Sequence, residues 1–345
     1  MGIRVGLIGY GLAGRVFHGP LIAADDRYEL SFVVSGDAER AALARERHPG
    51  ARVVPSVDEL LEHRDELDLA IVAAPTPEHA GLAERLLGTG LAVVVDKPLA
   101  VRADDAERLV DLADVRGAVL TVFHNRRWDG DFLTIRRLLD EGRLGEVWRF
   151  ESRFEWISSR PRPAWKSGTP GARGGGVAYD IGAHLLDQAI QLFGPVVESE
   201  VYGELLSHRS GGVNDDDSFI ALTHVSGVRS HLGMSSLVAQ RGFRFRVLGS
   251  GAAYTKRGLD PQEGQLGSGL SPRDPGYGVT TPDADGLLGT DAESVRVATE
   301  RGAYPAFYAR LADAISHGAP VPVDPRDAIA GLRVIEALQA RGISS

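Results

Sequence analysis

Residues 1–15 read MGIRVGLIGYGLAGR and carry the clearest structural signal in the chain. The apolar run Ile3–Ile8 is typical of a strand that is buried on both faces of a parallel sheet. A Gly-x-Gly-x-x-Gly pattern follows, in which one glycine permits a tight turn, the next leaves room for a pyrophosphate and the last lets a helix pack closely. The positive end of that helix attracts phosphate. We therefore predict that a dinucleotide binds at Gly9, Tyr10, Gly11, Leu12, Ala13 and Gly14.

The neighbouring sequence supports this prediction, although a glycine-rich turn can also arise for packing alone. Apolar residues at helical spacing follow the motif, and a second strand at 28–34 lies at the distance expected of a βαβ unit. Further strands are expected at 53–54, 67–74, 91–95 and 119–123, separated by helices at 38–47, 57–63, 80–89 and 103–115. Residues 1–123 are therefore predicted to form an α/β Rossmann domain with a parallel sheet.

The composition limits the classes of protein that fit. A chain of 345 residues favours two domains, and a net charge of −9 argues against nucleic-acid binding, which needs a basic surface. The chain has no cysteine, so it has no disulfide, thiol nucleophile or cysteine-bound metal. The first apolar run is too short for a signal peptide and no stretch reaches membrane-spanning length, so we expect a cytoplasmic protein without a membrane partner.

The residue after the second strand bears on which dinucleotide is bound. NAD-binding domains usually carry an acidic residue there, which bonds the ribose 2′-hydroxyl group. This chain has Ser35 instead, which would tolerate the 2′-phosphate of NADP, while Arg40 would add positive charge. We favour NADP(H). In the alternative, Asp37 takes the acidic role, Ser35 is only a turn residue and the cofactor is NAD(H).

Two loops follow strands at the carboxyl edge of the expected sheet, where ligands bind in such folds. The first loop spans residues 75–79, and we expect Pro75, Thr76 and His79 to approach the nicotinamide half of the cofactor. The second loop places Lys97 directly after a strand, beside a proline that fixes the turn. A lysine in such a place is usually only a surface charge.

Residues 124–345 are predicted to form a second domain, whose last helix can pack back on the first. Strands expected at 146–157, 197–206, 218–224, 229–238 and 243–248 lack long intervening helices, which indicates antiparallel pairing. Helices are expected at 130–141, 304–316 and 325–340, and residues 258–291 are expected to be irregular. The loop at 158–176 is too long for a simple turn, and we expect its Trp165 and Lys166 to close over the cofactor. Asp215, Asp216 and Asp217 are interpreted as a solvated turn rather than a metal site.

Several stretches together resemble the Gfo/Idh/MocA oxidoreductases: the fingerprint GYGLAG, the loop PTPEH, the turn DKP and a later Asp-x-x-x-His. The chain is most similar to the NADP-linked scyllo-inositol dehydrogenase branch, in the stretches 6–23, 93–101, 122–147, 179–194 and 258–263. Asp96 departs mildly from the family's usual Glu-Lys-Pro turn, and the resemblance weakens between 266 and 299. The resemblance implies a second α+β domain with an open, mostly antiparallel sheet, and a homodimer or homotetramer.

Asp180 and His184 are spaced i, i+4, so on one α-helix they would share a face. Oxidation of a secondary alcohol needs a base for the hydroxyl proton while a hydride leaves the same carbon, and His184 suits that role. The resemblance implies that Lys97 bonds the reacting oxygen and that Asp180 bonds the substrate or His184. The pair could instead be a helix-stabilising contact or include a satisfied core histidine. A metal site with Asp187 is disfavoured because Asp187 points about 60° away, so we expect no metal.

We therefore predict an NADP(H)-dependent oxidoreductase that acts on a secondary hydroxyl or ketone group of a cyclitol or sugar. Trp128 could instead be a packed aromatic and Arg153 a solvated strand residue, while Arg126 and Arg127 could simply form salt bridges between the domains. With these reservations, substrate contacts are expected from Asn125, Trp128, Arg153 and Tyr179. The resemblance also admits a lyase or glycosidase that keeps NAD tightly bound, and a non-catalytic regulator that senses the dinucleotide.

Overall fold

The computed structural model describes residues 2–157, 168–209 and 211–344. The chain divides into two compact units. The first comprises Met1–Asn125, Pro261–Gly278 and Ala303–Ala328, and the second comprises Arg126–Asp260, Val279–Gly302 and Ile329–Ser345. Each unit is thus assembled from segments that lie far apart in the sequence. Among the described residues, no helix combines the length and the apolar character needed to cross a membrane.

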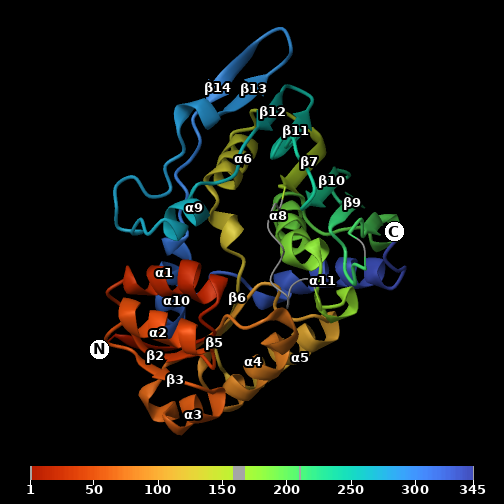
Figure 1. The fold of residues 1–345 in the computed structure, drawn as a ribbon. Coiled ribbons are helices and arrows are strands. Elements are labelled where there is room, and N and C mark those ends of the chain that lie inside the picture. Colours follow the sequence, from red (N-terminus) through yellow and green to blue (C-terminus); the bar gives the residue numbers. More distant parts are fainter. Residues whose placement is uncertain (1, 158–167, 210, 345) are drawn as a thin grey trace. The chain divides into compact units, whose positions relative to one another are not determined.

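The first unit contains a six-stranded sheet in the order β3-β2-β1-β4-β5-β6 (Figure 1). All neighbouring strands pair in parallel, so their carboxyl ends meet at one edge. The strands predicted for the first domain are confirmed, with ends shifted by a residue or two. They are β1 (Ile3–Ile8), β2 (Tyr28–Val34), β3 (Arg52–Val54), β4 (Leu69–Val72), β5 (Ala92–Asp96) and β6 (Leu120–Phe123).

Helices flank this sheet, as predicted, and the first of them has an unexpected start. The turn after β1 leads into a π-helix, η1 (Ala13–His18), which α1 (Gly19–Ala23) continues. The other predicted helices are α2 (Ala38–Arg47), α3 (Val57–Glu62), α4 (His79–Gly88) and α5 (Ala103–Arg116). Short 3-10 turns, η2 (Arg64–Glu66) and η3 (Thr76–Glu78), precede β4 and α4. Later parts of the chain add α9 (Gln262–Gly267) and α10 (Pro305–His317) to the same unit.

The second unit is built on an eight-stranded sheet in the order β14-β13-β12-β11-β7-β10-β9-β8. Only the β7–β10 pair is parallel within this sheet, so the predicted open, mostly antiparallel sheet is confirmed. The strands are β7 (Val147–Glu155), β8 (Tyr202–Leu206), β9 (Asp217–Thr223), β10 (Arg229–Ser235), β11 (Phe245–Gly249), β12 (Ala253–Lys256), β13 (Gly286–Gly289) and β14 (Ser294–Val297).

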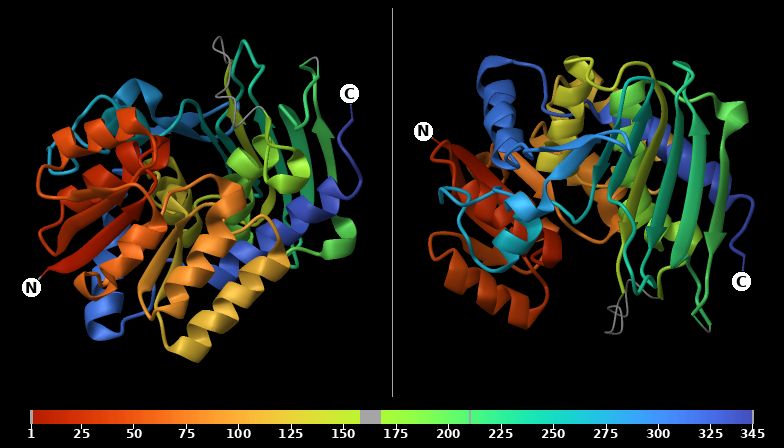
Figure 2. Two further views of the ribbon diagram at one scale, coloured as in Figure 1. Left: turned by 60° about the horizontal axis from the view of Figure 1, so that its bottom comes forward. Right: turned by 90° about the horizontal axis from the view of Figure 1, so that it is seen from above.

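Helices of the second unit cover one face of this sheet (Figure 2). They are α6 (Gly130–Asp140), α8 (Ala183–Phe193) and, near the chain's end, α11 (Pro325–Gln339). Helix α8 packs on β7 and β10, where Phe193 lies 5.3 Å from Phe150 between ring centroids. Side chains therefore alternate along β7 between the helix-covered face, with Phe150 and Phe154 buried, and the opposite face.

Two expectations for the second half of the chain are only partly confirmed. The segment 258–291 contains α9, a 3-10 turn at Pro282–Ala284 and strand β13. The strands β12, β13 and β14 are each only four residues long, and we attribute them to their pairing partners rather than to their own sequence. The strand expected at 197–206 is shorter than predicted, because its first residues form a 3-10 turn, Glu198–Glu200, before β8.

Candidate functional site

The glycine-rich turn has the geometry that its sequence predicts. Gly9 has a φ of +96°, and a Cβ atom there would clash with the carbonyl oxygen of Ala73. A Cβ atom on Gly14 would clash with the carbonyl oxygen of Gly9, so this glycine lets the helix approach the strand. Gly11 differs, because the nearest atom to its Cβ position is Arg40 Nη1 at 3.9 Å. Protein packing therefore leaves the space beside Gly11 open for a ligand.

Side chains of the same turn divide between the interior and the surface. Leu12 is exposed, whereas Tyr10 is buried and its ring meets His48 edge-on at 5.7 Å between centroids. Burial raises the pKa of the Tyr10 hydroxyl group. Tyr10 can thus contribute its backbone to a dinucleotide site, while its side chain packs in the core. The backbone of Ala13 opens the π-helix η1.

The residues after β2 hold the negative charge of Asp37 at the start of α2 and the positive charge of Arg40 near Gly11. Ser35 Oγ donates to the Asp37 carbonyl oxygen at 3.3 Å, and Asp37 Oδ1 accepts a hydrogen bond from Arg40 N at 2.9 Å. Asp37 is therefore the N-cap of α2, a role that occupies one of its carboxylate oxygens. The exposed guanidinium group of Arg40 lies toward Gly11. A positive charge thus stands beside the glycine turn.

The two loops at the carboxyl ends of β4 and β5 are joined through His79. Its Nδ1 lies 2.7 Å from the Pro98 carbonyl oxygen and its Nε2 lies 2.9 Å from the Ala74 carbonyl oxygen. His79 is buried, whereas Pro75 is exposed and Thr76 is half-buried. Lys97 follows β5 directly, is half-buried, and its backbone N–H donates to Asp96 Oδ1 at 2.9 Å. The peptide bond between Lys97 and Pro98 is cis.

A fully buried histidine stands near this loop pair. His18, the last residue of η1, has Nδ1 2.6 Å from the Tyr308 hydroxyl oxygen, and its ring lies 4.5 Å from that of Phe123 between centroids, at an interplanar angle of 48°. Burial lowers the pKa of His18 to about 4, while nearby Asp96 acts in the opposite direction and His79 adds to the lowering. Burial likewise raises the pKa of Tyr308 well above its usual value. The ring of His18 is therefore neutral near pH 7 and accepts from or donates to Tyr308 as a neutral tautomer.

Asp180 and His184 both belong to the second unit, on a helix that is not α-helical throughout. Residues Ala178–Gly182 form a π-helix, η6, and α8 begins only at Ala183. Asp180 is half-buried within η6 and His184 is buried in the first turn of α8. The predicted spacing therefore spans a junction between π and α geometry, a feature often found at functional sites.

Asp215 fixes the start of this helix, which corrects the interpretation of Asp215, Asp216 and Asp217 as a solvated turn. Asp215 and Asp216 are buried. Asp215 Oδ2 accepts from Ala178 N at 2.8 Å and from Ser218 Oγ at 2.7 Å, and the Asp215 carbonyl oxygen accepts from Val177 N. Asp216 accepts from two backbone N–H groups of the loop after β8. Buried carboxylates of this kind are stable because backbone N–H groups satisfy them.

Ionic and amide contacts tie α8 to the rest of the second unit. Arg127 donates to both carboxylate oxygens of Asp187, at 2.9 and 2.5 Å, and both side chains are largely buried. Gln188 Nε2 donates to the Arg126 carbonyl oxygen, and Gln188 Oε1 accepts from Arg244, whose other nitrogen donates to Ser152 Oγ. Arg126 also pairs with Asp129 within the second unit. The sequence gives Asp187 and Gln188 no marked role; their place beside His184 in an apolar helix is the signal that could have found them.

The predicted substrate residues fall into two groups. Trp128 and Tyr179 are buried, as is Asn125 in the 3-10 turn η4 (Asn125–Trp128). Arg153 points to the opposite face of the sheet from α8, with its side chain 49% exposed and its Nη1 3.8 Å from Glu155. The structure therefore does not bring Arg153 together with Asp180 and His184. Trp165 and Lys166 lie outside the described residues.

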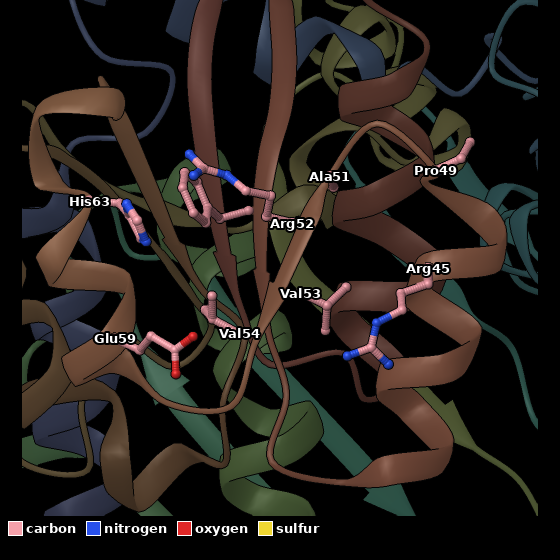
Figure 3. A pocket seen from close by; sticks show the side chains of 9 residues that line it. Arg45, Pro49, Ala51, Arg52, Val53, Val54, Glu59 and His63 are labelled. Carbon is pink, nitrogen blue, oxygen red and sulfur yellow. The ribbon is translucent and has the colours of Figure 1, made fainter.

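A cavity of about 560 Å³ opens elsewhere on the first unit, at the edge strand β3 (Figure 3). Its walls come from β2, β3, α2 and α3 and include none of the predicted site residues. They are Phe32, Arg45, Pro49, Ala51, Arg52, Val53, Val54, Glu59 and His63. Within the described ranges, no group of three or more acidic or histidine side chains is arranged to hold a metal ion.

A parallel Rossmann unit with this glycine turn, combined with an open-sheet unit, defines the two-domain NAD(P)-dependent oxidoreductases. Residues 3–124 match the family model "Oxidoreductase family, NAD-binding Rossmann fold", and residues 136–341 match its "C-terminal alpha/beta domain". The chain therefore belongs to the Gfo/Idh/MocA oxidoreductase family, and the predicted class of enzyme is confirmed.

Individual relatives are similar to this protein over nearly the whole chain. The Escherichia coli K12 oxidoreductase YdgJ is 39% identical over 97% of this chain and 94% of its own length. The Bacillus subtilis scyllo-inositol 2-dehydrogenase (NADP⁺) IolW is 32% identical over 97% of this chain and 92% of its own length. The solved structure of an oxidoreductase from Yersinia pestis superposes with a TM-score of 0.88 at 38% identity, covering 98% of this chain and 94% of the other.

Proposed function

We propose that this oxidoreductase uses NADP(H) and acts on a secondary hydroxyl or ketone group of a cyclitol or sugar. The position of Arg40 beside Gly11 carries the cofactor part of the proposal. A guanidinium group there suits the 2′-phosphate of NADP, whereas the carboxylate that would repel this phosphate, Asp37, caps α2. The name of the relative IolW, which includes NADP⁺, supports the same choice.

The residues present also fit the pyrophosphate of a dinucleotide. No protein atom lies closer than 3.9 Å to the Cβ position of Gly11. The backbone N–H groups at the start of η1 would face the phosphates of such a ligand in this fold. The backbones of Gly9, Tyr10, Leu12, Ala13 and Gly14 would line the same turn. Pro75, Thr76 and His79 belong to the loop after β4, which we assign to the nicotinamide half. The bound dinucleotide would supply a hydride acceptor or donor at nicotinamide C4.

The chain's own side chains would handle the proton and the reacting oxygen. We assign His184 as the base that takes the hydroxyl proton, while the hydride, with its two electrons, leaves the same carbon for the cofactor. Lys97 would donate a hydrogen bond to the reacting oxygen and stabilise its developing negative charge. Asp180 would bond the substrate or orient His184. Asn125, Trp128 and Tyr179 are retained as substrate contacts, while Arg153 is placed last among these because it faces the other side of its sheet.

Binding measurements with matched variants test the cofactor assignment. Nicotinamide fluorescence should show tighter binding of NADPH than NADH. Arg40→Ala should weaken NADPH binding by roughly tenfold to a hundredfold, as expected for a lost charge-assisted hydrogen bond, and Ser35→Asp should abolish the preference. Arg45→Ala is the control, because Arg45 lies on the same helix but lines the cavity at β3. A wild-type preference for NADH would instead move Asp37 into the ribose site.

Turnover assays separate the oxidoreductase from the two alternatives. A dehydrogenase gives a net change in nicotinamide absorbance with a polyol or keto-inositol. A lyase or glycosidase with tightly bound NAD would convert substrate without this change, and a regulator would bind NADPH but turn over no polyol or sugar in the screen.

We further propose that the protein is a homo-oligomer in which the open face of the large sheet is covered. Exposed apolar side chains lie on that face, with Tyr202 53%, Phe219 37% and Leu287 42% exposed. Light scattering should report a dimer or tetramer, and Phe219→Glu should shift it toward the monomer. A monomeric wild-type protein would contradict the proposal.

A further inference from the structure

Three buried histidines in the described chain have different hydrogen-bond partners. His224 has Nδ1 2.8 Å from the Gly194 carbonyl oxygen and Nε2 2.7 Å from Ser230 Oγ. A neutral ring satisfies both contacts, because Nδ1–H donates to the carbonyl group and the serine hydroxyl group donates to Nε2. His18 contacts the Tyr308 hydroxyl group, which can also donate or accept. Neither ring needs a second hydrogen atom.

His79 is different because both of its partners are carbonyl oxygens. Nδ1 lies 2.7 Å from Pro98 O and Nε2 lies 2.9 Å from Ala74 O, and the residue is 1% exposed. A carbonyl oxygen can only accept a hydrogen bond. A neutral imidazole has one N–H group, so its bare nitrogen would face a buried carbonyl oxygen at hydrogen-bond distance, which is costly. Only a ring with hydrogen on both nitrogens satisfies both contacts.

The two carbonyl groups connect functionally distinct parts of the first unit. Ala74 follows Ala73, whose carbonyl oxygen lies against Gly9 in the glycine turn. Pro98 follows Lys97, whose backbone N–H donates to Asp96. His79 thus lies between the turn that we assign to the pyrophosphate and the lysine that we assign to the reacting oxygen.

We propose that His79 is a positioning residue, held as an imidazolium ion, which fixes the turn of Lys97 against the end of β4. The proposal rests on the role proposed for Lys97. As an imidazolium ion, His79 donates one charge-assisted hydrogen bond to the Pro98 carbonyl oxygen and one to the Ala74 carbonyl oxygen, so it ties the turn at Pro98 to the end of β4. The turn that presents Lys97 is then fixed from both sides, by His79 at Pro98 and by Asp96 at the lysine's own N–H group.

The charged groups around His79 are compatible with this state. His18, on η1, interacts electrostatically with both His79 and Asp96, and its ring is neutral near pH 7. Asp96, at the end of β5, is thus an anionic group of the same cluster, and Tyr308 on α10 stays protonated. The group that His18 joins to His79 thus contains one carboxylate, Asp96, and two neutral side chains, His18 and Tyr308.

Nuclear magnetic resonance of the histidine rings tests the hydrogen atoms directly and needs no substrate. In protein labelled with ¹⁵N-histidine at pH 7.5, one ring should carry hydrogen on both nitrogens, and this signal should vanish in His79→Leu. The ring of His224, assigned by His224→Gln, should show one protonated and one bare nitrogen. A His79 ring with a single N–H group at this pH would overturn the proposal.

Kinetics with two substitutions test the positioning role. At saturating NADPH, His79→Leu should lower kcat by about 10- to 100-fold, as expected for a displaced catalytic group. His79→Lys, which restores a cation with several donors, should recover part of kcat. If His79→Leu keeps the wild-type kcat, or loses activity only as NADPH binding weakens, the proposal is wrong. Should His79→Leu fail to fold, the protonation measured in the wild type and the recovery by His79→Lys still decide.

Failure of the proposed function would look different. A protein that binds no NADPH, or turns over no polyol or ketone, contradicts the proposed function while the ring signals still report on His79. A doubly protonated ring in such a protein would leave His79 as a purely structural contact and would remove the positioning role.

Discussion

The two groups of proposed catalytic residues are held in place in different ways. Lys97 follows a buried parallel strand directly, and its turn is held at backbone groups: the N–H group of Lys97 donates to Asp96, and the Pro98 carbonyl oxygen contacts His79. Asp180 and His184 lie on a helix that is held by side chains from distant segments, above all Asp215 and the Arg127–Asp187 pair. Sheet topology, with His79 at the following turn, thus positions the first group, whereas carboxylates and an ion pair from distant segments position the second.

The largest expected effects are on turnover, where both groups should matter equally. Lys97→Met and His184→Asn should each lower kcat by about two to four orders of magnitude, because each removes a group that acts on the reacting oxygen or its proton. Steady-state kinetics with the substrate found in the screen measure this. His317→Asn, an exposed histidine at the end of α10, is the control. A His184→Asn variant with near wild-type turnover would remove His184 from the proposed mechanism.

Stability should distinguish the two groups. Arg127→Met leaves Asp187 buried without its bidentate partner, so the free energy of unfolding should fall by about 3–5 kcal/mol. Replacing both residues, Arg127→Met with Asp187→Leu, should recover most of this loss. The exposed pair Arg326–Asp114 is the control, and Arg326→Met should change the unfolding free energy by less than about 1 kcal/mol in urea titrations. Equal losses at the two pairs would show that buried charge does not hold α8.

Acid should weaken the first unit through His18. The pKa of His18 is lowered to about 4 in the folded protein and is about 6.5 when unfolded, so the unfolded chain binds the extra proton between these values. The stability that the neutral ring contributes is therefore complete above pH 6.5 and is lost as the pH falls toward 4, by up to about 3 kcal/mol. In urea titrations from pH 7 to pH 4, the unfolding free energy of His18→Gln should depend less on pH than that of the wild type. The unfolding free energy of His317→Gln should depend on pH as that of the wild type does. Parallel curves for wild type and His18→Gln would contradict it.

The sequence predicts structure that depends on neighbouring residues better than structure that depends on distant ones. Within residues 1–123 the strands and helices are almost fully predicted, because buried strands, caps and the glycine turn are local signals, and Lys97 is found as the residue after a strand. Asp215 is misread because its partner Ala178 lies 37 residues away, and the bond from Arg127 to Asp187 spans 60. The same limit hides β12, β13 and β14, and the π-helical start at Ala178–Gly182, since none of these is specified by its own residues.

The smallest predicted effect separates the folding role of a glycine from its binding role. Gly11→Ala places a Cβ atom in open space, with Arg40 Nη1 at 3.9 Å as the nearest atom, so the unfolding free energy should change by less than about 1 kcal/mol. The same methyl group occupies the space assigned to the pyrophosphate, so the Kd for NADPH should rise about tenfold, or roughly 1.4 kcal/mol. Gly9→Ala is the matched variant, because its φ of +96° and the clash with Ala73 O should destabilise the fold itself. If Gly11→Ala binds NADPH as tightly as the wild type, the pyrophosphate does not lie against Gly11. The position of Arg40 beside Gly11 then no longer supports NADP as the cofactor.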